Sequence, residues 1–498
     1  MDERIKKALR FIFSKPPALP LIPGEENLEP IVNYREPTPD ELALGFTEGK
    51  DEEQNRAIYQ AKFIPQSDRN IHFYVVGASG SGKTKFLQTL IWQDIKNGNG
   101  FGVIDPHGDL VDDVKGYLYL LSGRSQEFLH NKVVLIDPTD PKYTVGFNPL
   151  ERIQGMSSAE LAAELVNVFK KIWHDAWGAR MEDLLKNSLI ALIENNLTLA
   201  ELWLFLTDRE VRRKVLEKVE HPICRQYFER FNSLREQTQN EWMESTLNKS
   251  NAFMSDERVR QMFAVEKSTF NLREIIDNKK ILLVRLDKGR LKESADLLGS
   301  LLLAKIQMAA FTRTDIPQSK RIPFYLYIDE FQNFATDNFI EMLAEARKYE
   351  LSLVLAHQNL AQLTQNLRAS ILTNCRIQTF FRISRDDSNI LAKEALTPIY
   401  ANPPGWEFYI QALQQLPDRA CIIRKSGGGV VPIRTFDLDS PWELNKTENE
   451  EEFAETIKDF NIGMNFLVEK EKVEKEYQKR QEELTKIDEP DSFKEPRQ

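Results

Sequence analysis

The sequence has few cysteines and no long hydrophobic segment, and both features narrow the class of protein. Three cysteines, Cys224, Cys375 and Cys421, are far apart among 498 residues, and none belongs to a CxxC pair. This distribution argues against a disulfide framework or a zinc site and is typical of a reducing cytosol. No apolar run approaches the ~18 residues that cross a bilayer, and the N-terminus lacks the apolar core of a secretory signal. We therefore predict a cytoplasmic protein with no integral membrane segment; a basic amphipathic stretch at residues 1–14 leaves open a peripheral position at the inner face of a membrane.

The chain also lacks an excess of positive charge. Its 66 basic and 76 acidic residues give a net charge of −10. The segment from Pro441 onward accounts for −7 of this charge, so the first 440 residues carry only −3. A nearly neutral body exerts no general attraction on nucleic acids, and any contact with DNA must come from a local basic lining.

One motif that is present has a direct chemical meaning, because residues 77–84 match the pattern GxxxxGK[ST]. The motif and the residue after it are Gly77, Ala78, Ser79, Gly80, Ser81, Gly82, Lys83, Thr84 and Lys85. An apolar run at 71–76 precedes the motif and a helical pattern follows it, which is the context of a nucleotide-binding P-loop. Backbone N–H groups of such a loop and the positive end of its helix face phosphate oxygens. We predict that Lys83 binds the β- and γ-phosphates of ATP and that the Thr84 hydroxyl binds Mg²⁺.

Further short apolar runs predict the strands of a mainly parallel sheet. They lie at residues 101–105, 132–137, 280–286, 324–330, 351–356 and 376–381. Helical patterns separate most of them, which indicates parallel strands covered on both faces. Asp105 ends the first of these runs, where the carboxyl ends of parallel strands form the ligand edge of a sheet. Asp105 therefore either lies near the nucleotide or caps the following turn.

A second nucleotide motif (Walker B) follows the apolar run 324–328, where Asp329 and Glu330 stand. We predict that Asp329 holds the Mg²⁺ shell and that Glu330 is the general base that polarises the attacking water. The run 351–356 ends at His357 and Gln358. A glutamine at a strand end beside the nucleotide can sense the γ-phosphate and orient water, which is the role predicted for Gln358. His357 is interpreted as structural.

Residues 157–265 have an almost wholly helical pattern, with apolar residues spaced near 3.6. We therefore predict an α/β fold, a P-loop NTPase with a mainly parallel sheet, into which an all-helical domain is inserted. A hairpin within residues 44–64 is expected as an addition to the edge of the sheet. The predicted parts are a proline-rich arm at 1–40, the first part of the nucleotide-binding domain at 41–154, the helical insertion at 155–268, the second part at 269–440, and an acidic, partly helical or disordered tail at 441–498.

Together these motifs resemble the conjugative TraG/TraD-like coupling ATPases of type IV secretion, within the HerA/FtsK P-loop superfamily. The resemblance covers roughly residues 70–435, and the order of motifs around a helical insertion is its most specific feature. Besides the P-loop and the insertion, it is carried by Asp105-Pro106-His107-Gly108-Asp109, Phe147-Asn148-Pro149-Leu150, Tyr327-Ile328-Asp329-Glu330-Phe331, Glu345-Ala346-Arg347 and His357-Gln358.

The resemblance implies a RecA-like motor that assembles as a homo-oligomeric ring, usually a hexamer. Such a motor binds ATP and Mg²⁺, hydrolyses ATP at subunit interfaces and moves DNA through a central channel. It also implies an arginine finger supplied by the neighbouring subunit. Arg347 matches that finger by its position between the Walker B motif and Gln358, and Arg382 and Arg385 are the alternatives.

The predicted function is an ATP-driven, ring-shaped DNA translocase that serves conjugation or type IV secretion. Its expected partners are DNA and relaxase or secretion-channel proteins. Basic residues predicted to line the DNA channel are Lys288, Arg290, Lys292, Arg382 and Arg385. Phosphate contacts at these residues would make DNA binding dependent on salt and independent of sequence.

Two other functions stay open. Membrane-bound coupling proteins begin with transmembrane helices, which this sequence lacks, so one alternative is a soluble HerA-like translocase that works with a nuclease in repair or phage defence. HerA-like proteins normally carry a sizeable β-barrel before the P-loop, whereas only about 70 residues precede it here. The other alternative is a nucleotide-gated adaptor, in which ATP orders the ring and the helical insertion docks cargo.

Overall fold

The computed structural model describes residues 31–51, 56–122, 132–174, 177–336, 338–396, 405–425, 427, 429–441 and 450–486. The chain divides into two compact units. The sheet unit comprises Met1–Ile136 and Leu272–Asn461, and the helical unit comprises Asp137–Asn271 and Ile462–Gln498. The chain therefore enters the helical unit twice, once after the first strands of the sheet and again near its C-terminal end. Of the proline-rich arm predicted at 1–40, residues 1–30 lie outside the described residues.

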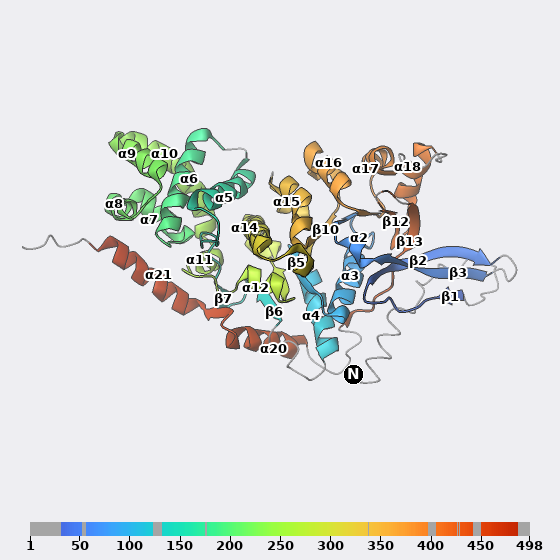
Figure 1. Cartoon of the computed structure of the whole chain (residues 1–498). Coiled ribbons are helices and arrows are strands. Elements are labelled where there is room, and N and C mark those ends of the chain that lie inside the picture. The colour runs from blue at the N-terminus through green and yellow to red at the C-terminus, as the bar shows by residue number, and fades with distance from the viewer. Residues whose placement is uncertain are drawn as a thin grey trace, which may run out of the picture. The chain divides into compact units, whose positions relative to one another are not determined.

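Within the described residues, a twelve-stranded sheet forms the centre of the sheet unit (Figure 1). Its strands are β1 Ile31–Asn33, β2 Glu41–Asp51, β3 Arg56–Pro65, β4 Phe73–Val76, β5 Gly100–Asp105, β6 Val133–Ile136, β8 Ile281–Arg285, β9 Phe324–Ile328, β10 Leu351–His357, β11 Ile377–Phe380, β12 Ala420–Lys425 and β13 Val430–Arg434. They are ordered β1-β3-β2-β13-β12-β11-β4-β10-β9-β5-β8-β6. Neighbours from β11 to β6 are parallel, whereas β11 to β12, β12 to β13, β13 to β2 and β2 to β3 are antiparallel. The hairpin expected within residues 44–64 is present as β2 and β3.

The central parallel strands are buried along their whole length because both faces of the sheet are covered. Every residue of β4, β5, β9 and β10 is buried. Helices supply the cover, as a parallel sheet requires. In the sheet unit they are α2 Gln66–Arg69, α3 Lys83–Asn97, α4 Asp109–Ser122, α12 Leu272–Asp277, α13 Lys288–Leu291, α14 Glu293–Phe311, α15 Phe339–Glu345, α16 Gln365–Asn374, α17 Arg385–Leu391, α18 Trp406–Gln415 and most of α20 Glu450–Gly463.

Among the described residues, one helical segment is long and apolar enough to cross a membrane by length and composition. It is Glu293–Asp315, with a mean hydropathy of 1.3 over its most apolar window, and 78% of that window is buried inside the protein. The sequence analysis found no uninterrupted apolar run of this length. Its burial explains the composition, because a helix packed on all sides needs apolar residues on all sides.

The helical unit contains α5 Ser158–Ile172, α6 Ala179–Glu194, α7 Leu202–Thr207, α8 Arg209–Glu217, α9 Pro222–Ser233, α10 Glu236–Met254, α11 Glu257–Phe263 and α21 Lys470–Thr485, with a small sheet of β7 Tyr143–Val145 and β14 Leu467–Glu469. Local capping signals start several of these helices. Ser157 and Glu160 form a reciprocal capping box at the start of α5, and the Asp208 side chain accepts from two backbone N–H groups of α8.

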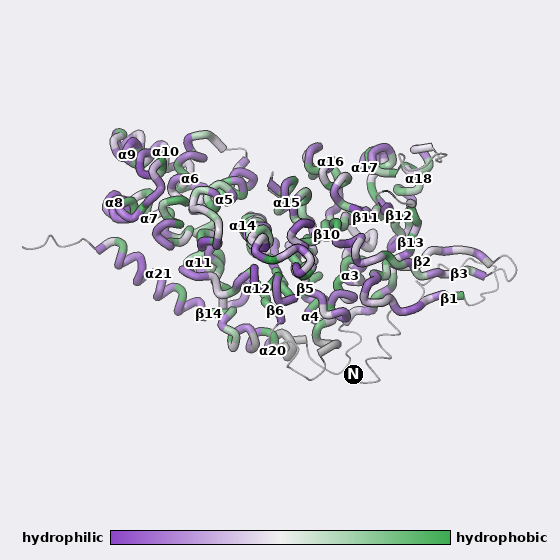
Figure 2. Tube along the Cα trace, viewed as in Figure 1, coloured by the Kyte–Doolittle hydropathy of each residue, from purple (hydrophilic) through white to green (hydrophobic). Residues whose placement is uncertain are grey.

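The charged C-terminal segment packs onto both units, which its composition did not predict. Ile457 of α20 is buried in the core of the sheet unit, and the Asn461 side chain accepts from the Leu135 N–H of edge strand β6 at 3.2 Å. In the helical unit, β14 pairs with β7, and α21 buries Val473 and Tyr477. Figure 2 shows that α21 is otherwise mostly hydrophilic. A narrow apolar stripe docks it together with polar contacts, among them the Arg480–Glu201 ion pair at 2.8 Å.

A buried ion pair ties the P-loop helix to the Walker B strand. The Arg69 guanidinium and the Asp94 carboxylate, on α2 and α3, are both fully buried, and one of their contacts is 2.7 Å long. The Tyr327 hydroxyl of β9 donates to the same carboxylate at 2.6 Å, and the Tyr325 ring lies 3.6 Å from the guanidinium carbon. Protein partners therefore replace water around each of the two buried charges, as burial of a charge requires.

Replacing Asp94 with asparagine is expected to lower the free energy of unfolding by about 3–5 kcal/mol, because the buried Arg69 guanidinium then has no counter-charge. Urea unfolding of the two proteins measures this difference. Arg213→Ala is the matched control: it breaks ion pairs between side chains that are at least half exposed, and it should leave the unfolding midpoint nearly unchanged. An equal loss in both variants would contradict the expectation.

Candidate functional site

The P-loop is held between the ends of two strands. It begins at Gly77, directly after β4, and the Gly77 N–H donates to the His357 carbonyl of β10 at 3.3 Å. The Ala78 N–H donates to the Arg382 carbonyl just after β11 at 2.8 Å. A Cβ on Gly77 would stand 2.4 Å from the Phe381 Cβ, so only glycine fits this approach.

Glycine conformations shape the loop around an anion site. Gly80 and Gly82 have φ angles of 73° and 110°, in the region that other residues adopt at a cost. A Cβ on Gly80 would meet nothing within 4 Å. The helix α3 starts at Lys83, so its unpaired N–H groups open onto this loop. The loop therefore has the geometry of a phosphate cradle.

The side chains of the loop fit a bound phosphate. The Lys83 ammonium is buried and donates to the carbonyls of Gly77 and Ala78 at 2.6 and 3.3 Å. Burial lowers the pKa of Lys83, while Glu330 and Asp329 raise it in part. The Ser81 hydroxyl is buried without a hydrogen-bond partner among the described residues. Thr84 follows in an exposed position at the start of α3. Phosphate oxygens would satisfy the hydroxyl and replace the carbonyls as partners of Lys83.

The Walker B acids stand at the end of β9, two strands from the P-loop strand. Asp329 is buried, and burial together with the neighbouring Asp105 and Glu330 carboxylates raises its pKa to about 7, against the opposite influence of Lys83. A buried carboxyl among other carboxyls fits a divalent cation, because the positive charge of the cation stabilises the ionised form that burial and repulsion disfavour. Thr84 and Asp329 are the residues that would hold it.

Two amide side chains hold the Glu330 carboxylate. Gln358 Nε2 donates to Glu330 Oε1 and Gln332 Nε2 donates to Glu330 Oε2, each at 2.7 Å. Glu330 itself has a φ of 45°, which turns the chain sharply after the strand. The structure thus brings together Glu330 and Gln358. Gln332 was missed by the sequence analysis, since nothing in the pattern marks a glutamine two residues beyond the acid pair.

Two further predicted residues have clear structural roles. His357 is buried, and its Nε2 and the Tyr74 hydroxyl are 2.5 Å apart; burial and the Lys83 charge lower the pKa of His357 to about 3, so the ring is neutral. Asp105 accepts from the N–H groups of His107 and Val111 at 2.8 and 3.1 Å, and its charge acts on Asp329. The predicted turn cap is therefore present, while a position near the nucleotide stays a prediction that the proximity of Asp105 to Asp329 supports.

Arg347 lies at the amino ends of the parallel strands, whereas the P-loop lies at their carboxyl ends. It is exposed and precedes the first residue of β10, whereas the loop contacts the last residue of that strand. Seven strand residues at ~3.3 Å each separate the two edges by roughly 20 Å. Within the described residues the Arg347 side chain makes no ion pair. Arg347 therefore does not reach the Lys83 site of its own chain.

The five basic residues predicted to line a DNA channel follow the carboxyl ends of β8 and β11, on the same sheet edge as the P-loop. Three of them form ion pairs: Lys288 with Asp296 at 2.8 Å, Arg290 with Asp287 at 3.4 Å, and Arg382 with Asp418 at 2.8 Å. Arg290, Lys292 and Arg385 are exposed. These pairings reduce the local positive charge that the sequence alone indicates.

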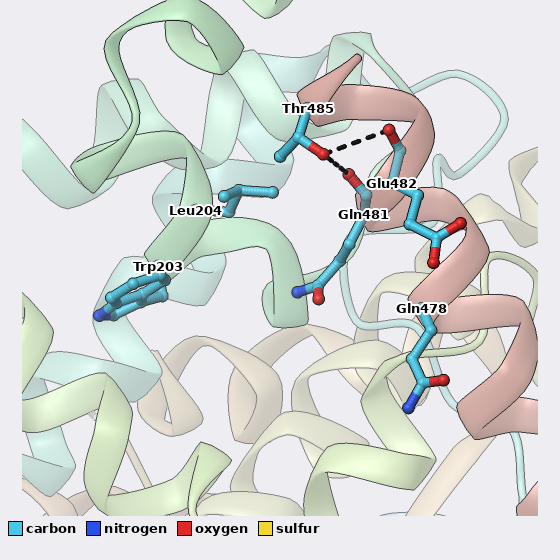
Figure 3. A pocket seen from close by; sticks show the side chains of 6 residues that line it. All are labelled: Trp203, Leu204, Gln478, Gln481, Glu482 and Thr485. Carbon is cyan, nitrogen blue, oxygen red and sulfur yellow. Dashed lines mark hydrogen bonds between the residues drawn. The ribbon is translucent and has the colours of Figure 1, made fainter.

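A separate pocket of about 340 Å³ lies in the helical unit between α7 and α21 (Figure 3). It is lined by Trp203, Leu204, Gln478, Gln481, Glu482 and Thr485. Trp203 is half exposed there, and the Thr485 hydroxyl donates to carbonyls of its own helix. The lining offers one carboxylate and two amides, and no pair of groups suited to acid–base chemistry.

Comparisons with known proteins agree with this geometry. The model of the family described as "Type IV secretion-system coupling protein DNA-binding domain" matches residues 61–396, more than half of the chain. The structure of plasmid coupling protein TrwB with the GTP analogue GDPNP is 16% identical with a TM-score of 0.53, and TrwB with the ATP analogue ADPNP is 16% identical with a TM-score of 0.50. Each match covers 76% of this chain and 88% of the other.

The structure of VirB4 of Thermoanaerobacter pseudethanolicus is also similar. It is 13% identical with a TM-score of 0.53, over 81% of this chain and 98% of the other. The comparison with curated protein sequences found no match. At such identities the structures establish the fold alone: a P-loop NTPase with a mainly parallel sheet and a helical unit, which confirms the fold predicted from the sequence.

Proposed function

Since this chain belongs to the family of type IV secretion-system coupling proteins, we propose that it is an ATPase that moves DNA through a homo-oligomeric ring during conjugation or type IV secretion. The observation that carries the proposal is the set of P-loop, acid and glutamine side chains that one chain gathers at the carboxyl ends of its parallel strands. Lys83 lies within electrostatic reach of Asp329 and Glu330, and Gln358 is bonded to Glu330. An adaptor that only binds nucleotide has no use for such a base.

ATP and Mg²⁺ are the proposed cofactors. The P-loop N–H groups and Lys83 would bind the phosphates, and Thr84 and Asp329 would hold the cation. Mg²⁺, when bound, neutralises charge on the β- and γ-phosphate oxygens. Glu330, oriented by Gln332 and Gln358, would accept the proton of the attacking water. Relatives of the same fold are described with GTP and ATP analogues, which supports a nucleoside triphosphate as substrate.

The position of Arg347 supports an assembly in which subunits share nucleotide sites, and a ring is the proposed form. This exposed arginine is at the edge of the sheet opposite its own P-loop, so its charge can complete a nucleotide site only in a neighbouring subunit. Such a finger stabilises the charge on the transferring phosphate. A hexamer is the proposed assembly. The exposed Lys292 and Arg385, together with Arg290, which is paired with Asp287, are proposed to contact DNA phosphates.

The partners and location belong to the same proposal. A coupling protein connects a DNA–relaxase complex with a secretion channel at the membrane, so we expect relaxase and channel proteins as partners and a position at the inner face of the membrane. The family assignment favours this reading over a HerA-like translocase with a nuclease. The Trp203 pocket supports one element of the adaptor alternative, since it offers a half-exposed tryptophan beside polar side chains on the helical unit.

Lys83→Ala is expected to lower DNA-stimulated ATP hydrolysis by on the order of 10²–10³-fold, the loss that removal of one preorganised donor to a transition state produces. The assay compares hydrolysis by the full chain without DNA, with single-stranded DNA and with double-stranded DNA. Lys96→Ala removes a lysine from the far end of the same helix and should leave hydrolysis unchanged. Hydrolysis that no DNA stimulates would overturn the translocase proposal in favour of the adaptor.

A further inference from the structure

The turn before β12 packs directly against the P-loop. The Arg419 N–H donates to the Ser81 carbonyl at 2.9 Å, and a Cβ on Gly82 would stand 3.0 Å from the Arg419 Cα. In the sheet, β9 with its acids is two strands from β4 on one side, and β12 is two strands from β4 on the other. Arg419 and the Walker B acids therefore flank the P-loop from opposite sides.

This arrangement determines which end of a nucleotide meets Arg419. In P-loop NTPases the acids and the attacking water are at the γ-phosphate. The γ-phosphate must therefore face β9, because Asp329 and Glu330 stand at its end. The α-phosphate and the nucleoside then leave the loop on the β12 side, where Arg419 stands.

The backbone of Arg419 is fixed by hydrogen bonds, and its side chain stays partly exposed to solvent. Its backbone has a φ of 65° and is held on both sides, since the N–H donates to Ser81 and the carbonyl accepts from the Thr435 N–H at 2.9 Å. Its guanidinium pairs with the Asp437 carboxylate, and each side chain is about one-third exposed, at 36% and 34%. A guanidinium paired along one edge keeps its planar faces free for stacking.

We propose that Arg419 and Asp437 form the nucleoside subsite of this nucleotide site. The guanidinium face stacks on the purine base, and a carboxylate oxygen of Asp437 accepts a hydrogen bond from a ribose hydroxyl. Stacking uses the π-face of the base and not its hydrogen-bonding edge, so adenine and guanine nucleotides bind with similar affinity. This inference rests on the proposed function, because it assumes that the P-loop binds a nucleotide.

The test uses ligands with and without a nucleoside. Calorimetric titration of the full chain with ADP, GDP and inorganic pyrophosphate, in the presence of Mg²⁺, gives three dissociation constants. Arg419→Ala is expected to weaken ADP and GDP binding by about 5- to 150-fold, the range for losing one stacked base. It is expected to leave pyrophosphate binding unchanged. Arg419→Lys keeps the charge and loses the plane, and should weaken both nucleotides in the same way.

The controls separate this inference from the proposed function. Arg213→Ala, on the helical unit, should change none of the three constants. If Arg419→Ala fails to fold, Arg419→Lys carries the test. Wild-type protein that binds neither ADP nor pyrophosphate would overturn the proposed function and the subsite together. Wild-type binding with no change in either Arg419 variant, or an equal loss of pyrophosphate binding, would overturn the subsite alone.

Discussion

Replacing Glu330 with glutamine is expected to lower the rate of ATP hydrolysis by about 10²–10⁴-fold, the contribution of a positioned general base. Nucleotide binding should persist, because the Lys83 contacts to the P-loop do not involve Glu330. The substitution keeps the shape of the side chain. In wild type, each carboxylate oxygen of Glu330 accepts a hydrogen bond from Gln332 or Gln358. The glutamine places an N–H donor at one of these two positions, so the facing amide must rotate and present its oxygen instead.

The measurement is single-turnover hydrolysis of bound ATP together with ADP affinity, for wild type and Glu330→Gln. Glu341→Gln, an exposed position on α15, is the matched control and should behave as wild type. A rate loss with unchanged ADP affinity is the expected pattern. Wild-type hydrolysis by Glu330→Gln would falsify the role of Glu330 as base.

Arg347→Ala is expected to lower hydrolysis by the assembled protein by about 10³–10⁵-fold, the contribution of an arginine finger. ADP affinity should change little, because the arginine acts on charge that develops during phosphoryl transfer. Arg347 is roughly 20 Å from the P-loop of its own chain by strand length, so the effect must pass between subunits. Lys348→Ala, its exposed neighbour paired with Glu345, is the control and should hydrolyse ATP normally.

Mixing two inactive variants distinguishes a finger in trans from one in cis. In a ring that contains both Arg347→Ala and Glu330→Gln subunits, some interfaces combine an intact Glu330 from one chain with an intact Arg347 from the other. Such interfaces should restore activity well above that of either variant alone. If Arg347 served its own chain, each subunit would lack one essential group, and the mixture would stay inactive.

The nucleotide site was predictable in outline because its parts are marked locally. Strand ends are recognisable from apolar runs, and the carboxyl ends of parallel strands meet at one edge. Glu330 and Gln358 could therefore be assigned to one site before any contact was known. The pairing of Gln332 with the same carboxylate had no such mark, since a turn residue can point in several directions. Arg419 likewise had no such mark, because it directly precedes the antiparallel hairpin of β12 and β13, far along the chain from the P-loop.

The sequence by itself determined the P-loop, the Walker B acids, the parallel strands and the helical insertion. Each of these is a pattern of neighbouring residues that backbone geometry and burial impose locally. Only the tertiary structure decided that the acidic C-terminal segment docks on both units through Ile457, Val473 and Tyr477. It also decided that Lys288, Arg290 and Arg382 are paired with carboxylates. The docking contacts and the Arg382–Asp418 pair join residues distant in the chain, and composition records the charges but not which of them meet.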